Sequence, residues 1–363
     1  MKRLVVCCDG TWQNLSRPYP TNVVKLAQSI KPVAQDVIPQ VFYYQAGLGT
    51  RDKFDKLTGG AFGWGIDDNI QDGYRFLCLN HEPGDEIYLF GFSRGAYTAR
   101  SLADLVYCSG LLERQHIRKL PQAYQLYRDR AVKPGDAVAE QFRNDYAKDV
   151  SITLLGCWDT VGQLGVPNRI PILSKLVNAK YRFYDTCVNL WVKTALHAIA
   201  IDERRTVFDV TPMQISDEEA STELRQVWFP GTHGCVGGGT QKTSGLSDAA
   251  LQWMLDEMNK LDLGLEFVDQ PQRVAESGIN PDYTTSFDDQ KSIFTLIGIQ
   301  ERNILLNSSL SQNNHTDFEQ PFFDYNIHLS AKQCWKLRQE PLYRPKNLVL
   351  HKQCFDAFND APT

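Results

Sequence analysis

The 363-residue sequence has no stretch that approaches the roughly 18 consecutive apolar residues of a transmembrane helix. Its first apolar run, Leu4–Cys8, ends at Asp9 and is too short for the hydrophobic region of a secretory signal peptide. We therefore expect a protein that is made and folded in the cytoplasm. Export would need a machine that requires no cleavable signal.

Clustered basic residues, paired cysteines and metal-binding spacings are also missing. The formal net charge is −5, and no run of lysine or arginine indicates a nucleic-acid surface. The nine cysteines form no C-x-x-C pair, and their odd number and the adjacent Cys7 and Cys8 argue against a disulfide framework. No His, Cys and Asp residues have zinc spacing, so we expect no metal, no cofactor and no nucleic-acid partner.

What the sequence does contain is an alternation of short β-rich runs and longer amphipathic stretches. Near-continuous apolar runs, typical of strands covered on both faces, lie at 3–8, 40–45, 86–91, 151–158 and 223–229. Helical patterns lie at 22–31, 66–80, 94–108, about 111–147, about 190–206 and 246–260. This alternation predicts an α/β fold with a mostly parallel sheet and helices on both faces.

No clear linker divides the chain, so we expect a single domain over residues 1–363. The segments at about 111–147 and 163–195 are long for simple crossovers, and they predict helical excursions that cap one end of the sheet. Residues 261–363 form a C-terminal elaboration whose pattern assigns no particular structure.

The stretch "IYLFGFSRGAYTAR", residues 87–100, places Ser93 inside a G-x-S-x-G pentapeptide. A β-prone run precedes the serine and a helical pattern follows it, which is the strand–turn–helix context of a nucleophile elbow. Gly91 and Gly95 suit such a turn because it leaves no room for side chains beside the serine. The competing interpretation is a tight turn in which Ser93 only caps the following helix.

Two backbone segments are candidates for an oxyanion hole. The N–H group of Arg94 lies at the start of the helix that follows Ser93, where amide groups face a developing negative charge. Gly10 and Thr11 follow the first strand and suit the second donor, with Asp9 shaping the loop.

A serine nucleophile needs a base and an orienting acid. Asp159 follows the strand at 151–158, and His233 lies in the glycine-rich loop after the strand at 223–229, so the chain order is Ser, Asp, His as in α/β-hydrolases. Asp202 is the alternative acid, at the end of a predicted helix on which His197 is expected to be a core histidine. The competing interpretation of His233 is an exposed loop residue.

Seven ordered motifs carry a resemblance to a known family. They are "CCDGTWQN", "GIDDNIQDGYRFL", "LFGFSRGAYTARSLADLV", "LGCWDTVG", "HAIAIDERR", "VWFPGTHGCVGGG" and "LSDAALQWML". Over roughly residues 1–260 the chain closely resembles the α/β-hydrolase domain of the type VI secretion phospholipase effectors and its bacterial and fungal relatives. The resemblance implies a lipase or esterase that acts on phospholipid acyl esters, with Ser93 as nucleophile, His233 as base and Asp159 as the acid.

The resemblance also implies partners: a lipid or acyl-ester substrate, peripheral membrane contact through the helical excursions, secretion machinery and an immunity protein. The aromatic segment 163–191 is a candidate lining for an acyl pocket, and its aromatic residues suit an ordinary core equally well; they are Trp191, Tyr181, Phe183 and Tyr184. Two alternatives stay open, a soluble carboxylesterase or thioesterase, and a binding or regulatory module with weakened catalysis. The second rests on Cys235, which stands where relatives usually have an aspartate two residues after the histidine.

Overall fold

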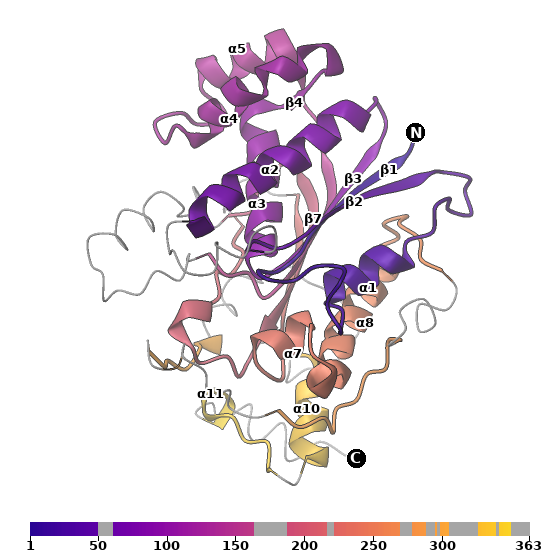
Figure 1. Ribbon diagram of the computed structural model, residues 1–363, viewed down its shortest axis with the longest axis vertical. Helices are drawn as coiled ribbons and strands as arrows, with labels where there is room; N and C mark the ends of the chain where they lie inside the picture. Colours follow the sequence, from indigo (N-terminus) through magenta and orange to yellow (C-terminus); the bar gives the residue numbers. More distant parts are fainter. Residues whose placement is uncertain are drawn as a thin grey trace.

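The computed structural model describes residues 1–49, 61–162, 187–215, 221–268, 278–287, 295, 298–304, 326–338 and 341–349. At the centre of this part lies a six-stranded parallel sheet with the order β2-β1-β3-β6-β7-β8 (Figure 1). Its strands are β1 (Arg3–Cys8), β2 (Gln40–Gln45), β3 (Glu86–Phe92), β6 (Ile152–Trp158), β7 (Val192–Ala200) and β8 (Glu223–Phe229). The expected α/β fold is confirmed.

Helices cover both faces of the sheet (Figure 1). On one face lie α2 (Ala61–Asn80) and α3 (Arg94–Ser109), and on the other lie α1 (Asn22–Ser29) and α8 (Ser244–Lys260). All six residues of β1 are buried, because Leu4 and Val6 pack toward α2 and α3 while Val5 and Cys7 pack toward α1 and α8. Burial of alternate residues on opposite faces explains the unbroken apolar run.

Residues 111–148 form a small unit beside α2 and α3. It contains β4 (Leu111–Leu112), the 3-10 helix η2 (Arg114–Lys119), α4 (Leu120–Arg128), α5 (Ala137–Tyr146) and β5 (Ala147–Lys148), and β4 pairs with β5 antiparallel. The unit follows the C-terminal end of α3, which starts at the carboxyl end of β3 and runs back along the sheet. It therefore lies toward the amino ends of the strands, at the top of Figure 1.

The prediction of a helix at about 190–206 is wrong, because the strand β7 occupies Val192–Ala200. This strand pairs with β6 on one side and β8 on the other, and every residue in it except Lys193 is buried. His197 is indeed buried, between Thr160 and Gln226, but on a strand. Of the excursion predicted at 163–195, residues 163–186 lie outside the described part, and the remainder leads into β7.

The last part of the chain packs against the carboxyl ends of β7 and β8. Its described elements are α10 (Leu329–Leu337) and α11 (Lys346–Val349), and they share a hydrophobic cluster with Ile199, Ile201 and Trp228. Smaller elements between the strands are η3 (Thr206–Phe208), α7 (His233–Gly237) and η4 (Gln241–Thr243). Among the helices that the structure describes, none is long and apolar enough to span a bilayer.

Candidate active site

Ser93 occupies a sharp turn between β3 and α3. Its backbone has φ 60° and ψ −122°, in the left-handed region that side chains rarely adopt. A Cβ atom on Gly91 would lie 2.4 Å from the carbonyl oxygen of Gly95, and one on Gly95 would lie 2.2 Å from that of Cys8. The two glycines therefore let the turn close against β1, as the sequence pattern predicts.

Replacing Gly95 with alanine should destabilise the fold by about 3 kcal/mol, because the new methyl group has to displace the backbone of β1. Urea denaturation measures the change. Gly135→Ala is the matched control, because a Cβ atom there meets nothing within 4 Å, and its effect should stay within about 0.5 kcal/mol. Equal stability of the two variants would contradict the close packing of the turn.

The side chains of Ser93, His233 and Asp159 lie in one hydrogen-bonded chain. His233 Nε2 is 2.8 Å from Ser93 Oγ, and His233 Nδ1 is 2.6 Å from Asp159 Oδ2. Ser93 makes no side-chain cap on α3, so its hydroxyl faces the imidazole instead. This geometry is that of a nucleophile, a base and an orienting acid, and all three side chains are buried.

Asp159 directly follows β6 and is completely buried. Besides His233, its carboxylate accepts hydrogen bonds from the N–H group of Ala200 at 2.9 Å and from the guanidinium of Arg302 at 2.6 and 3.0 Å. Burial alone would raise the pKa of Asp159, but the positive charge of Arg302 and the hydrogen bond to His233 hold that pKa well below its usual range. The carboxyl group is therefore ionised at neutral pH.

Two aromatic rings hold the imidazole of His233. The Phe92 ring lies 4.7 Å away between centroids, and the Phe208 ring lies 4.9 Å away at an interplanar angle of 29°. His233 begins α7, and its backbone N–H donates to a carboxylate oxygen of Glu203 at 3.2 Å. The histidine is thus a fixed, buried residue and not an exposed loop residue.

The alternative acid, Asp202, belongs to a different set of contacts. One of its carboxylate oxygens accepts from the N–H of Gly231 at 2.6 Å and from the hydroxyl of Tyr343 at 3.0 Å. These bonds tie the loop before α7 to the C-terminal part of the chain. Because Asp159 contacts the imidazole directly, the geometry favours Asp159 over Asp202.

The predicted oxyanion segments flank Ser93. Arg94 is the first residue of α3, and its guanidinium lies 5.9 Å from the centroid of the Trp12 ring. A Cβ atom on Gly10 would be 3.5 Å from Ser93 Cβ, which places this loop beside the nucleophile. The N–H of Gly10 donates to Asp9 at 2.7 Å, whereas the hydroxyl of Thr11 is buried without a hydrogen-bond partner among the described residues. Thr11 is therefore the better donor of the two.

The sequence places the chain in a known protein family. The sequence matches the family described as "T6SS, Phospholipase effector Tle1-like, catalytic domain" over residues 2–257, well over half of the chain. The chain belongs to this Tle1-like family.

Three individual proteins are similar to this chain at sequence identities of 16% to 30%. The chain is 30% identical over 238 residues to "Uncharacterized protein YEL023C" from Saccharomyces cerevisiae, an alignment that covers 58% of this chain and 33% of the yeast protein. The crystal structure of an uncharacterized protein from Pseudomonas aeruginosa has a TM-score of 0.47 at 16% identity, covering 78% of this chain and 49% of that chain. The Tle1 effector bound to the VgrG spike has a TM-score of 0.32 at 18% identity, covering 66% and 51%.

The Tle1-like chain thus spans about a third of its yeast relative and about half of each of these two solved chains. Its Cys235, where the resemblance leads us to expect an aspartate, is buried in the cluster around Trp228 and Leu246, with its sulfur 3.4 Å from the hydroxyl of Thr232. The substitution leaves the hydrogen bonds between Ser93, His233 and Asp159 in place.

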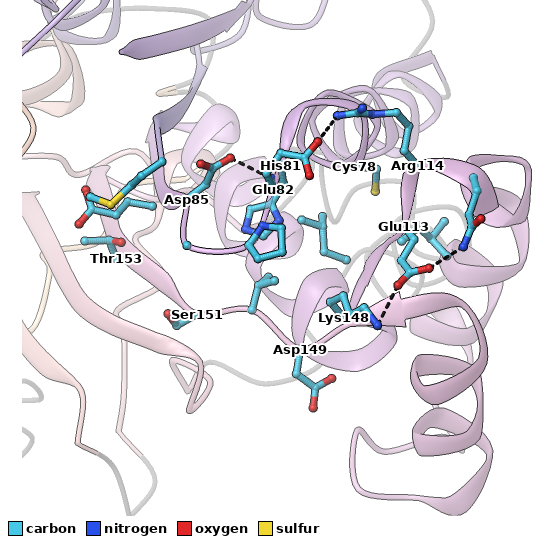
Figure 2. Close-up of a pocket in the computed structure, with 18 of the residues that line it drawn as sticks. Cys78, His81, Glu82, Asp85, Glu113, Arg114, Lys148, Asp149, Ser151 and Thr153 are labelled. Carbon is cyan, nitrogen blue, oxygen red and sulfur yellow. Dashed lines mark hydrogen bonds and ion pairs between the residues drawn. The ribbon is translucent and has the colours of Figure 1, made fainter. Parts of the chain in front are cut away.

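Two cavities differ in their relation to this site. One of about 350 Å³ lies next to the oxyanion loop and is lined by Gln13, Arg17, Pro18, Tyr19, Gly239, Thr240 and Gln241. The other, of about 870 Å³, is drawn in Figure 2. Its lining residues Glu86, Ser151, Thr153 and Lys193 place it at the amino ends of β3, β6 and β7, whereas Ser93 follows the carboxyl end of β3. Several of its charged side chains pair with one another, as in Arg114–Glu82 and Lys148–Glu113. The larger cavity therefore lies at the opposite end of the sheet from Ser93.

The described residues contain no group of three or more His, Cys, Asp or Glu side chains that could hold a metal ion. Trp191, a candidate for an acyl pocket, instead packs edge-on against Tyr107 at 5.2 Å, at the amino end of β7. The other aromatic residues predicted there, Tyr181, Phe183 and Tyr184, lie outside the described residues.

Asp9 anchors the loop after β1, in which Gly10 and Thr11 are the predicted oxyanion donors, through three hydrogen bonds. Its carboxylate accepts from Gly10 N–H at 2.7 Å, from the Thr21 hydroxyl at 2.9 Å and from the Tyr44 hydroxyl at 2.7 Å. Burial raises the pKa of Asp9 to about 6, because the hydrogen bonds from Tyr44, Gly10 and Thr21 offset the loss of water only in part. The loop therefore carries a group that titrates in the mildly acidic range.

Asp9→Asn should change how stability depends on pH. In the native state Asp9 binds its proton more tightly than in the unfolded state, so its contribution to stability is lost as pH rises from about 4 to 6. Relative to the variant, the wild type should lose about 2 kcal/mol of unfolding free energy between about pH 4.5 and 7.5. Urea denaturation of both proteins across this range measures it, and a difference that stays constant with pH would contradict the burial argument.

Sequence reasoning missed Arg302, which reaches the candidate site from the segment 298–304. That segment lies beyond the residues matched by the Tle1-like family. Its short sequence "GIQERNI" contains an isolated arginine with no pattern that points to Asp159, 143 residues earlier. Only the folded chain brings the two residues together.

Proposed function

We propose that this Tle1-like chain is a serine hydrolase that cleaves acyl ester bonds of phospholipids. Ser93 is the nucleophile, His233 the general base and acid, and Asp159 the group that orients the imidazole. The observation that carries the proposal is the continuous hydrogen bonding from Ser93 Oγ to His233 Nε2 and from His233 Nδ1 to Asp159. Membership of a phospholipase effector family supports phospholipid as the substrate class.

In the proposed reaction His233 Nε2 accepts the hydroxyl proton as Ser93 Oγ attacks the ester carbonyl carbon. The resulting oxyanion receives hydrogen bonds from the N–H group of Arg94 and from the Thr11 hydroxyl, which has no other hydrogen-bond partner among the described residues. The bond to the leaving alcohol then breaks, and His233 returns its proton to that alcohol. A water molecule, deprotonated by His233, attacks the acyl-enzyme and releases the fatty acid and the free Ser93 hydroxyl.

The surroundings of the nucleophile suit an amphiphilic substrate. The 350 Å³ cavity beside the oxyanion loop is lined by polar side chains and by Arg17, which offers room and positive charge for a phosphate-bearing head group. Leu15, in the same loop, has 62% of its surface exposed and could rest on a lipid surface. The excursion at 111–148 lies at the opposite end of the sheet, so we assign membrane contact to the loop after β1 instead.

Export belongs to the same proposal. The Tle1 effector of the solved complex is bound to the VgrG spike of a type VI secretion system. By analogy we propose that this chain is carried by such a spike and that an immunity protein protects the producing cell. Pull-down of the full chain with purified VgrG tests the first step, and the absence of binding would count against it.

The deciding experiment compares two kinds of substrate. Purified protein is given phospholipid vesicles and, separately, a soluble short-chain nitrophenyl ester, with His233→Ala as the matched inactive control. Fatty-acid release from vesicles at a higher kcat/KM than for the soluble ester supports a phospholipase. The reverse preference favours a soluble esterase. Inertness of the folded wild type toward both esters and toward a fluorophosphonate would favour the binding-module alternative that Cys235 suggested.

A further inference from the structure

The guanidinium of Arg302 donates hydrogen bonds to Asp159, the candidate triad acid, from both of its terminal nitrogens. One donates to Asp159 Oδ1 at 2.6 Å and the other to Asp159 Oδ2 at 3.0 Å, a forked pair of the strongest charge-assisted type. The arginine side chain is 3% exposed and the aspartate side chain is fully buried. Because the contact is two-pronged, it fixes the rotation of the carboxylate plane as well as its position.

The same guanidinium also holds the backbone on either side of the carboxylate. Its two nitrogens donate to the carbonyl oxygens of Ala200 at 2.7 Å and Phe208 at 2.6 Å. Ala200 N–H in turn donates to Asp159, and the Phe208 ring stacks on the imidazole of His233. Arg302 therefore contacts Asp159 directly. It acts on His233 indirectly, through Phe208, whose ring stacks on the imidazole.

Lysine or an uncharged side chain could not make these contacts. A lysine ammonium presents a point charge without a planar fork, so it could neutralise Asp159 but could not hold both oxygens and both carbonyls in the same geometry. A methionine would fill the space and leave the carboxylate buried with His233 and one amide as its partners. Geometry and charge can thus be separated by two substitutions.

We propose that Arg302 is a positioning residue of the hydrolase: its fork orients Asp159 toward His233, and its charge keeps that carboxylate ionised in a site closed to water. This inference rests on the proposed function. Arg302 does not touch the substrate; it acts through Asp159 and Phe208. Because it lies beyond residues 2–257, the part of the chain outside the family match completes the catalytic geometry.

The charge effect predicts a particular pH dependence. The ionisable groups around the Asp159–Arg302 pair are His233, His197, Glu203 and Asp209. Of these four groups, His233 is the one that hydrogen-bonds to Asp159, and the charge of Arg302 stabilises the ionised carboxylate most strongly. Without Arg302 the pKa of Asp159 should rise. The pH below which activity is lost should therefore be higher than in the wild type.

The test is a pH profile of kcat and KM for a soluble nitrophenyl ester with wild type, Arg302→Lys and Arg302→Met. Arg204→Met is the matched control, since it removes a half-buried arginine that pairs with Glu301, next to Arg302, and does not contact Asp159. Arg302→Lys should lower kcat about 10²-fold with little change in KM, because the acid is displaced while its charge is kept. Arg302→Met should lower kcat further and move the acidic limb of the profile up by about one pH unit or more.

Circular dichroism and urea denaturation of each variant report folding separately. A folded Arg302→Met with a wild-type kcat and pH profile would overturn the inference. If that variant does not fold, Arg302→Lys decides, and a wild-type kcat there would overturn the role of the fork. A kcat loss in Arg204→Met as large as in Arg302→Lys would overturn it as well. A wild type that hydrolyses no ester would instead overturn the proposed function, together with this inference.

Discussion

Ser93→Ala should lower kcat for ester hydrolysis by about 10⁵- to 10⁶-fold and abolish labelling by a fluorophosphonate. In the proposed reaction the Ser93 hydroxyl oxygen, which lies 2.8 Å from His233 Nε2, forms the acyl-enzyme. Single-turnover hydrolysis and labelling of the purified protein measure the two effects.

Ser101→Ala is the matched control for this experiment. Ser101 is buried further along the same helix, α3, and it should keep full labelling and a kcat within about threefold of the wild type. Labelling that persists in Ser93→Ala would show that the serine of the G-x-S-x-G turn is structural. Attention would then pass to the binding-module alternative.

Asp159→Asn should lower kcat by about 10⁴-fold, whereas Asp202→Asn should change kcat by less than about threefold. The asparagine cannot stabilise the imidazolium that forms when His233 takes the Ser93 proton, and its amide favours the wrong imidazole tautomer. Asparagine at position 202 still offers an oxygen to Gly231 and Tyr343, so the loop before α7 should keep its place. Steady-state kinetics on soluble ester measures both.

Asp159→Asn also leaves the buried Arg302 without its anion, which should destabilise the fold by about 3 kcal/mol or more. Kinetics are therefore read only below the temperature at which the variant unfolds, as followed by circular dichroism. The assignment of the acid would be reversed by an active Asp159→Asn together with an inactive Asp202→Asn.

The strands of the sheet show how much secondary structure can be predicted from the local sequence. β1, β2, β3, β6 and β8 are runs of apolar and β-branched residues, and the sequence predicts all five within one or two residues. β7, "VKTALHAIA", is different because its alanines, leucine and lysine also suit a helix. Its two hydrogen-bonded neighbours, β6 and β8, make it a strand, and a local window of sequence contains neither of them.

For the candidate site, sequence by itself determined the parts that depend on neighbours along the chain. The nucleophile turn around Ser93 and the chain order of Ser93, Asp159 and His233 are of this kind, because steric limits at a turn and the strand–turn–helix pattern are local. Their catalytic roles stay predictions until the variants above are measured.

Only the tertiary structure decided which carboxylate meets His233 and what surrounds that carboxylate. Asp159 and Asp202 each follow an apolar stretch, and the parallel alignment of β6 and β7 brings Asp159 to the imidazole while Asp202 turns toward Gly231 and Tyr343. Arg302 enters from a segment 143 residues away. Folding removes both charged side chains from water, which is costly unless each is paired with an opposite charge. Local sequence patterns do not show which distant residues will form such a pair.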